Sequence, residues 1–264
     1  MTDPDRSIHS RLLAQLFPLV RQAGAAIMDV YDGGSSQEIK KDGSPVTLAD
    51  QKAEAIILHG LAEIAPDIAI VSEENAASHT IDPPSQFFLV DPLDGTREFI
   101  KHDGKGAFTV NIALIEQGEP VLGVVFAPAL ERMFAGVVGE GAVESTEQGA
   151  ASIAVRAVPA SGATALASAS HGDPQTEAWL SSHDIASIDN VGSSLKFGVI
   201  ACGEADVYPR FGPTMEWDTA AGDAVLRAAG GSVCHPDGAP FTYGKAAFRN
   251  GPFIASGRFV LDTD

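Results

Sequence analysis

Two aspartates, Asp91 and Asp94, stand three residues apart in the segment FFLVDPLDGTREFI, which spans residues 87–100. The apolar start of this segment predicts a buried strand that ends at Asp91. Two ionised carboxylates about 4 Å apart repel each other by about 4 kcal/mol at an effective dielectric constant of about 20. A proton or a cation must offset this repulsion, and ligands that offer only hard oxygen atoms suit Mg²⁺. The pair is therefore a candidate metal site.

Gly95 and Thr96 follow the two aspartates and predict the first turn of a short helix. The N–H groups and the dipole of such a turn favour an anion such as phosphate. The same residues also fit an ordinary turn, in which Asp94 tolerates the bend and Gly95 supplies a positive φ. The segment alone leaves both interpretations open.

Four more acidic residues stand where elements are expected to begin or end. Glu73 and Glu74 follow a short apolar strand in DIAIVSEEN, although solvated loop acids would give the same pattern. Asp50 stands three residues after Thr47, a spacing typical of a capping box, and its carboxylate can hold a hydroxyl as well as an amide. Asp218 in WDTAAG is expected to be the N-cap of a helix. Each acid has a structural explanation, so the case for a metal centre rests on the whole set.

The acids lie among clearly periodic segments of the first half of the chain. An amphipathic helix is expected over residues 7–31, and a second is expected to begin near Thr47 and to end before Pro66. Two strands that carry acids follow these helices. Three β-rich stretches over residues 107–138 then predict an antiparallel meander.

A change of pattern divides the chain into two parts. Residues 139–151 are rich in Gly and Glu and are expected to be a boundary, and beyond them predicted strands and helices alternate. We therefore expect an α+β sub-domain over about residues 1–150 and an α/β sub-domain over about residues 151–264.

Composition excludes several classes of protein. The chain has 264 residues and a formal net charge of −18, and a surface of this sign repels nucleic acids and anionic lipids. No apolar run approaches the ~20 residues of a spanning helix, and the start lacks the order of a secretory signal. We expect a cytoplasmic protein with no integral membrane segment and no nucleic-acid polymer as a partner. Metal ions, helix N-termini or local Lys and Arg must hold any bound anion.

Four segments occur in an order that resembles the inositol monophosphatase superfamily of Mg²⁺-dependent, lithium-sensitive phosphatases: SPVTLAD, VSEEN, LVDPLDGTREFI and WDTAAGDAVLRAAGG. The resemblance covers about residues 10–256. The segment VGSSLKFGVIACGEADVYPRFGPTMEWDTAAG is similar to the CysQ-type branch of that superfamily, the 3′(2′),5′-bisphosphate nucleotidases. The resemblance implies a layered α-β-α-β-α sandwich that forms one catalytic domain over residues 1–264.

The resemblance also implies roles for the acids. A first Mg²⁺ ion would be held by Glu73, Asp91 and the backbone carbonyl of Leu93, and a second by Asp91, Asp94 and Asp218. In such chemistry the metals neutralise phosphate oxygens and activate water, so no Ser, Cys or His nucleophile is required.

By the same resemblance, Thr96 and Asp50 orient and deprotonate the attacking water, and Glu74 lies where a third ion could bind. The residues expected at the reacting phosphate are Glu73, Leu93, Asp94, Gly95, Thr96 and Asp218.

A second group of residues suggests a site for another phosphate. Ser193, Ser194 and Lys196 stand at the start of a predicted helix, where amides, hydroxyls and an ammonium can converge on an anion, and Arg210 could add a bidentate contact. Surface ion pairs are the alternative explanation for the two cations. The resemblance implies that these residues hold the distal phosphate of a nucleotide. It places a base contact at His171, which could also be an ordinary loop residue.

Three functions follow from this reading. The first is release of the 3′-phosphate of adenosine 3′,5′-bisphosphate (PAP) to give AMP, with the sulfated form PAPS as a further substrate, in support of sulfate assimilation. The second is an inositol monophosphatase-type sugar phosphatase, which shares every metal ligand. The third is a non-catalytic metal- or nucleotide-sensing module, which would lack a ligand or Thr96, and neither is missing. Members of the superfamily are monomers or homodimers, and some associate peripherally with the inner membrane.

Overall fold

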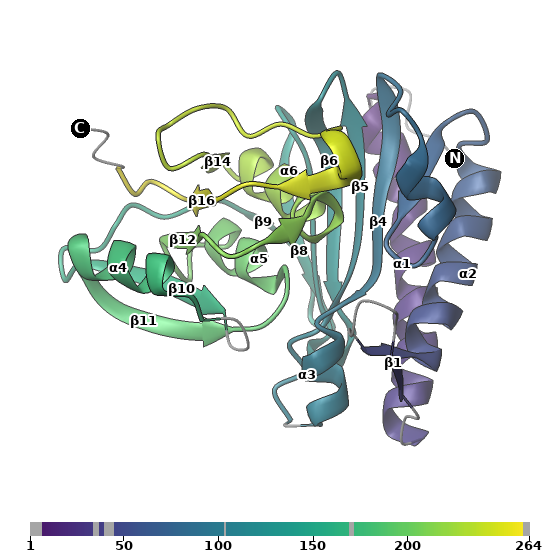
Figure 1. Cartoon of the computed structure of the whole chain (residues 1–264), viewed down its shortest axis with the longest axis horizontal. Helices are drawn as coiled ribbons and strands as arrows, with labels where there is room; N and C mark the ends of the chain where they lie inside the picture. Colours follow the sequence, from purple (N-terminus) through teal and green to yellow (C-terminus); the bar gives the residue numbers. More distant parts are fainter. Residues whose placement is uncertain (1–6, 34–36, 40–44, 103, 169–171, 261–264) are drawn as a thin grey trace.

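The computed structural model describes residues 7–33, 37–39, 45–102, 104–168 and 172–260. Its helices and sheets stack in five alternating layers: helices cover the outer face of each main sheet, and further helices lie between the two sheets (Figure 1). One apolar core lies between the first two helices and the larger sheet, another lies between the two sheets, and a third lies on the outer face of the smaller sheet. The layered α-β-α-β-α sandwich is confirmed.

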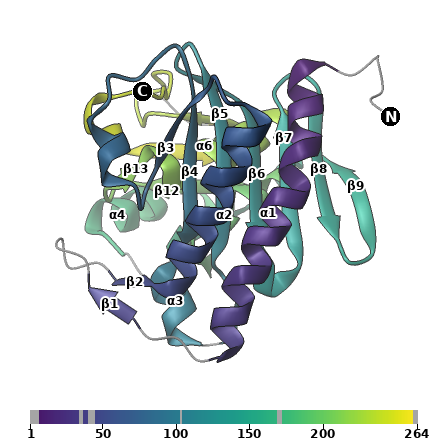
Figure 2. The ribbon, with the colours of Figure 1, turned by 90° about the vertical axis from the view of Figure 1, so that its right-hand side faces the viewer.

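Helices α1 (Ile8–Gly33) and α2 (Leu48–Ile64) cover the outer face of the larger sheet (Figure 2). Buried apolar residues recur about once per turn of α1, as at Leu13, Leu16 and Val20. Both helices confirm the prediction from the sequence. Within the described part of the chain, no helix combines the length and the hydrophobicity that crossing a membrane requires.

The larger sheet has seven strands in the order β3-β4-β5-β6-β7-β8-β9. Strands β3 and β4 are parallel, and the other neighbouring pairs are antiparallel, which confirms the meander expected over residues 107–138. Residues 139–151 contribute to the β8–β9 hairpin, so the change from one sheet to the other falls later in the chain. The bounds are β3 (Ala69–Ser72), β4 (Gln86–Asp94), β5 (Thr109–Glu116), β6 (Glu119–Ala127), β7 (Arg132–Val137), β8 (Gly141–Thr146) and β9 (Gly149–Ile153).

A bulge in β4 brings the two aspartates of DPLD to the same face of the sheet. Asp91 pairs with Asn111 of β5 and Asp94 pairs with Thr109, so three steps along β4 match two steps along β5. In a regular strand, side chains three residues apart would point to opposite faces. The strand therefore continues through the bulge to Asp94, and the predicted strand end at Asp91 is wrong.

The smaller sheet has five strands in the order β11-β10-β12-β16-β14. Helices α5 (Leu195–Ala201) and α6 (Ala220–Ala228) lie between the two sheets, and α4 (Pro174–Ser182) packs on the outer face. The expected alternation of strands and helices is confirmed. The bounds are β10 (Ala163–Ser168), β11 (Ile185–Val191), β12 (Val207–Arg210), β14 (Ser232–Cys234) and β16 (Phe253–Ser256).

Shorter elements complete the fold. Helix α3 (Thr96–Lys101) follows β4 directly. Two small sheets pair β1 (Gln37–Ile39) with β2 (Pro45–Thr47) and β13 (Thr214–Met215) with β15 (Arg249–Asn250). The 3₁₀ turns are η1 (Ala76–Thr80), η2 (Pro128–Leu130), η3 (Glu216–Asp218) and η4 (Ala246–Phe248).

The turn η3 changes the expected role of Asp218. Helix α6 begins at Ala220 and its N-cap residue is Thr219, whereas Asp218 ends the preceding turn. Asp218 Oδ2 accepts a hydrogen bond from the Met215 amide at 2.7 Å, so the carboxylate closes η3. The prediction that Asp218 is the N-cap of the helix is wrong.

Candidate active site

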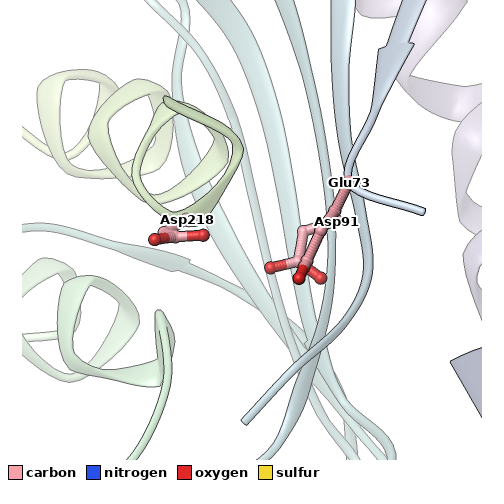
Figure 3. A group of neighbouring side chains, drawn as sticks. All are labelled: Glu73, Asp91 and Asp218. Atoms are coloured by element: carbon pink, nitrogen blue, oxygen red, sulfur yellow. The ribbon is translucent and has the colours of Figure 1, made fainter. Parts of the chain in front are cut away.

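Three carboxylates from distant parts of the chain meet in space. Glu73 follows β3, Asp91 lies in the neighbouring β4, and Asp218 ends η3. One oxygen atom of each lies within 4.8 Å of the other two. Figure 3 shows Asp218 opposite Glu73 and Asp91, which come from the two adjacent strand segments. The structure thus brings three predicted metal ligands together, and their binding of metal stays a prediction.

The electrostatics of this carboxylate group call for a counter-charge. Burial raises the pKa values of Asp91 and Asp218 well above their usual range, and the neighbouring carboxylates raise them further. Burial also raises the pKa of Asp94 to about 6, although Lys196 and the Ser194 amide oppose this shift. Clustered carboxylate oxygens are the donor set that a hard divalent cation such as Mg²⁺ prefers. The residues present therefore fit the implied metal.

Asp94 and Leu93, the other two predicted ligands, lie next to the carboxylate group. Asp94 Oδ2 accepts a hydrogen bond from the Ser194 amide at 2.5 Å. The Leu93 amide donates to Asp91 Oδ1 at 3.0 Å. The Leu93 carbonyl oxygen lies 3.3 Å from Thr96 Oγ1 and is one of two alternative acceptors for the single proton of that hydroxyl. The main chain of the β4 bulge therefore orients the Asp91 carboxylate and connects it to the start of α3.

Asp50 serves two partners at once. Its Oδ2 accepts hydrogen bonds from the Thr47 amide at 2.8 Å and from the Thr47 hydroxyl at 2.7 Å, which confirms the capping box at the start of α2. Its Oδ1 lies 3.4 Å from Thr96 Oγ1, near the outer limit of a hydrogen bond. The structure thus brings the predicted water-activating pair together.

The turn between β4 and α3 depends on glycine. Gly95 has a φ of 89°, in the left-handed region that glycine adopts without strain. A Cβ at this position would lie 3.0 Å from the Ala107 carbonyl oxygen, so a larger residue would also be crowded. The tight turn places Thr96 directly after the bulge.

Glu74 is half-buried and follows Glu73 after the end of β3.

A cleft extends from the carboxylate group to Lys196 and Arg210, which lie on the side of the smaller sheet. Its volume of about 590 Å³ falls in the range of small-molecule sites. The predicted site residues that line it are Glu73, Asp94, Gly95, Thr96, Ser193, Lys196, Arg210 and Asp218. His171, the predicted base contact, lies outside the described residues, and its neighbour Gly172 lines the cleft.

The two cations of the cleft are buried. Lys196 is 3% exposed and Arg210 is 8% exposed. The Lys196 ammonium donates to the carbonyls of Ser193 at 2.5 Å and Val191 at 3.2 Å, and it lies 4.8 Å from the ring centre of Tyr208. Burial lowers the pKa of Lys196 to about 8. The alternative explanation of these residues as surface ion pairs is therefore wrong.

Comparison with known proteins identifies the fold family. The profile of the inositol monophosphatase family matches residues 9–256. The chain belongs to this family. Relatives within it include the 3′(2′),5′-bisphosphate nucleotidase CysQ of Salmonella typhimurium (strain LT2), which is 48% identical over 226 residues that cover 84% of this chain and 89% of the relative. The protein of the same name from Escherichia coli (strain K12) is 44% identical over 250 residues, covering 93% and 99%.

Solved structures of inositol monophosphatase family members agree with this assignment. The crystal structure of CysQ from Bacteroides thetaiotaomicron superposes with a TM-score of 0.79 at 33% identity, covering 96% of this chain and 99% of that one. An inositol monophosphatase from Anabaena (Nostoc) sp. PCC 7120 superposes with a TM-score of 0.72 at 25% identity, covering 94% and 90%. The shared fold extends over nearly the whole chain.

Sequence reasoning missed the residues that hold η3 in place. Glu216 is fully buried, and its carboxylate accepts hydrogen bonds from the amides of Gly244 at 2.7 Å and Lys245 at 2.9 Å. Asn250 Nδ2 donates to the Met215 carbonyl at 2.7 Å. These bonds fix the turn that carries the third carboxylate, and no local pattern in MEWD distinguishes its glutamate from a solvated one.

His79 connects two segments that carry members of the carboxylate group. Its ring stacks on Trp217 with centroids 4.7 Å apart, and its Nε2 lies 2.8 Å from the Ser72 carbonyl oxygen. Ser72 precedes Glu73, and Trp217 precedes Asp218. This contact ties the end of β3 to η3.

We expect the metal-free protein to lose stability as the pH rises from about 4, near the usual carboxyl pKa, through about 6, the raised pKa of Asp94, and further as Asp91 and Asp218 ionise. Because the pKa values of Asp91, Asp94 and Asp218 are raised in the folded state, the fold keeps protons that the unfolded chain has already lost, and the free energy of unfolding falls as the pH increases. If Mg²⁺ binds to these carboxylates, it takes the place of the protons. Calorimetric melting in EDTA and in Mg²⁺ should show a stabilisation by Mg²⁺ that is larger at high pH than at low pH by at least about 4 °C.

Two variants separate this effect from the general acidity of the chain. Asp218→Asn keeps an acceptor for the Met215 amide and should flatten the pH dependence of the metal-free protein. Asp189→Asn removes an exposed charge from β11 and should leave the dependence unchanged. The same slope in wild type and in Asp218→Asn would contradict the explanation.

Proposed function

We propose that this chain is a Mg²⁺-dependent 3′(2′),5′-bisphosphate nucleotidase that releases the 3′-phosphate of PAP to give AMP and also acts on PAPS. The proposal rests on one observation: the cleft that holds the carboxylate group also holds the buried cations Lys196 and Arg210. A substrate with two phosphates can occupy both regions, whereas a sugar monophosphate needs only the first. The relatives named CysQ support this choice. Removal of PAP supports sulfate assimilation.

Two Mg²⁺ ions are the proposed cofactors. Glu73, Asp91 and the Leu93 carbonyl hold the first, and Asp91, Asp94 and Asp218 hold the second. When bound, such ions neutralise phosphate oxygens, make water a better nucleophile near neutral pH and stabilise the leaving oxygen. The close approach of three carboxylates and their raised pKa values support this assignment.

Thr96 and Asp50 move the proton of the attacking water. The Thr96 hydroxyl donates toward Asp50 Oδ1 and so presents its oxygen as an acceptor for a water proton. The water oxygen forms a bond to phosphorus as its proton passes to the Asp50 carboxylate. The bond between phosphorus and the 3′-oxygen breaks, and that oxygen takes up a proton from solvent. The Gly95 and Thr96 amides hold the phosphate, and Glu74 marks the position of a third ion.

The distal phosphate lies against the start of α5. Two of the three Lys196 donors serve backbone carbonyls, which leaves one for a phosphate oxygen. Ser193 and Arg210 line the same part of the cleft, and the guanidinium can bind an anion in bidentate fashion. His171 and Gly172 are the proposed neighbours of the base.

Phosphate release from PAP and from inositol 1-phosphate, each with and without Mg²⁺, tests the proposed function. We expect release from PAP only with Mg²⁺, with a kcat/KM at least about tenfold above that for inositol 1-phosphate, a difference of about 1.4 kcal/mol. The opposite preference would establish the sugar phosphatase instead. No release from either substrate would indicate a non-catalytic metal- or nucleotide-sensing module.

Lys196→Ala should raise the KM for PAP by about tenfold or more, because it removes a desolvated cation from the distal phosphate. The KM for adenosine 3′-monophosphate, which lacks that phosphate, should stay within about twofold of the wild-type value. Lys52→Ala, which removes an exposed lysine from α2, is the matched control. Equal effects of Lys196→Ala on both substrates would place Lys196 outside the distal site.

A further inference from the structure

The loop before α5 packs tightly against the turn that follows β4. Ser193 has a φ of 50°, in the left-handed region that non-glycine residues rarely adopt. A Cβ on Gly192 would lie 2.8 Å from the Ala107 carbonyl oxygen, and a Cβ on Gly95 would lie 3.3 Å from Ser193 Cβ. Backbone strain of this kind persists only where surrounding contacts hold it.

Ser194 supplies those contacts. It is 2% exposed, and its amide donates to Asp94 Oδ2 at 2.5 Å. Its hydroxyl donates to Asn111 Oδ1 at 2.6 Å, so the bond of 2.7 Å between Thr109 Oγ1 and Ser194 Oγ has Thr109 as its donor. One buried serine therefore ties the loop before α5 to both β4 and β5 at the bulge.

Asn111 shows that this arrangement has a cost. It is 1% exposed and stands opposite Asp91 in the pairing of β4 with β5, which places its side chain on the face that carries Asp91. Its Oδ1 accepts from Ser194, whereas its Nδ2 has no acceptor within the described part of the chain. A buried donor without a partner is unfavourable and calls for a functional explanation.

The two ends of this network reach both parts of the proposed site. Asp94, at one end, is a proposed metal ligand, and its carboxylate is shared with the Ser194 amide. At the other end, the Ser193 carbonyl accepts from Lys196, and both residues line the cleft. When two ligands bias one shared element, each changes the affinity of the other by the same factor.

We propose that Ser194 is a positioning residue that couples metal binding at Asp94 to binding of the substrate's 5′-phosphate by residues 192–196. This inference rests on the proposed function, because that function places the 5′-phosphate at the start of α5. Ser194 acts through its amide on Asp94 and through the hydroxyl that anchors the loop to β5. Loss of the hydroxyl frees the loop without removing the amide, so the two binding events become independent.

Calorimetric titration of Mg²⁺ with and without saturating AMP measures this coupling without turnover. In the wild type, AMP should tighten Mg²⁺ binding by about fivefold or more, and Mg²⁺ should tighten AMP binding by the same factor. Ser194→Ala should reduce this factor to below about twofold. Thr109→Val removes the donor to the serine hydroxyl and should act in the same direction, whereas Thr109→Ser keeps a hydroxyl and should retain the coupling.

Ser187→Ala is the matched control, since it removes the hydroxyl of an exposed serine in β11 that bonds to Thr164. No coupling in the wild type, or wild-type coupling in Ser194→Ala and Thr109→Val, would overturn the proposal. If Ser194→Ala does not fold, the two Thr109 variants decide the question. Phosphate release from PAP is measured in parallel. No release by the wild type would refute the proposed function. Normal release by the wild type, together with unchanged coupling in the variants, would refute this inference alone.

Discussion

Asp94→Asn should lower kcat for PAP by at least about 100-fold, because it removes a charged ligand of the proposed second Mg²⁺ ion. The amide oxygen of the asparagine can still accept the hydrogen bond from the Ser194 amide, so the contact between the two halves of the site is kept. The half-saturating Mg²⁺ concentration should rise as well. Steady-state phosphate release over a range of Mg²⁺ concentrations measures both quantities.

Stability measurements separate this effect from damage to the fold. Burial raises the pKa of Asp94 to about 6, so a neutral side chain there should leave the metal-free protein at least as stable as the wild type at about pH 8. Asp189→Asn changes an exposed acid in the same way and should keep full activity. Activity of Asp94→Asn within about tenfold of the wild type would contradict its assignment as a metal ligand.

Thr96→Val should lower kcat by about 100-fold or more with little change in KM, because it removes the hydroxyl that links water to Asp50 and keeps the side-chain volume. Thr96→Ser retains the hydroxyl and should lose less than about threefold. Rates at saturating PAP and Mg²⁺ test the pair. Similar rates for the valine and serine variants would exclude a role for the hydroxyl.

A double-mutant cycle tests whether Thr96 and Asp50 act as a unit. Asp50→Asn should be about as slow as Thr96→Val, and the double variant should be hardly slower than either, because the two residues serve one proton transfer. Asn at position 50 still offers an oxygen to the Thr47 cap, so α2 is preserved. Additive losses would show that the two residues act separately.

Local patterns predicted the parts of the fold that depend on neighbouring residues. The apolar repeat of α1 and the Thr47–Asp50 capping box are settled within a few residues, and both are found as expected. The segment FFLVDPLDGT also indicated the place of the carboxylates. These features need no knowledge of what packs against them.

Features that depend on pairing with distant segments were missed. The bulge between Asp91 and Asp94 exists because two residue steps along β5 pair with three along β4, which the sequence of β4 alone does not reveal. Asp218 is typical of an N-cap, yet in the tertiary fold Thr219 is the N-cap, α6 begins at Ala220, and the aspartate lies in η3. In the sequence, Asn111 and Asn250 look like ordinary polar residues. Only the structure shows that both are buried, that Asn111 bonds to Ser194 and that Asn250 bonds to Met215.

The three carboxylates come from both halves of the fold, so under the proposed function their origin also sets when catalysis can begin during synthesis of the chain. Glu73 follows β3 and Asp91 lies in the adjacent strand β4 of the larger sheet. The third carboxylate, Asp218, lies in η3, which comes after β10, β11 and β12 of the smaller sheet in the sequence. A ribosome-bound chain that lacks η3 has two acids of the three and no complete pocket. Native contacts between segments so far apart in sequence form late. If these carboxylates hold the proposed Mg²⁺ ions, a chain that lacks η3 is therefore expected to release no phosphate from PAP.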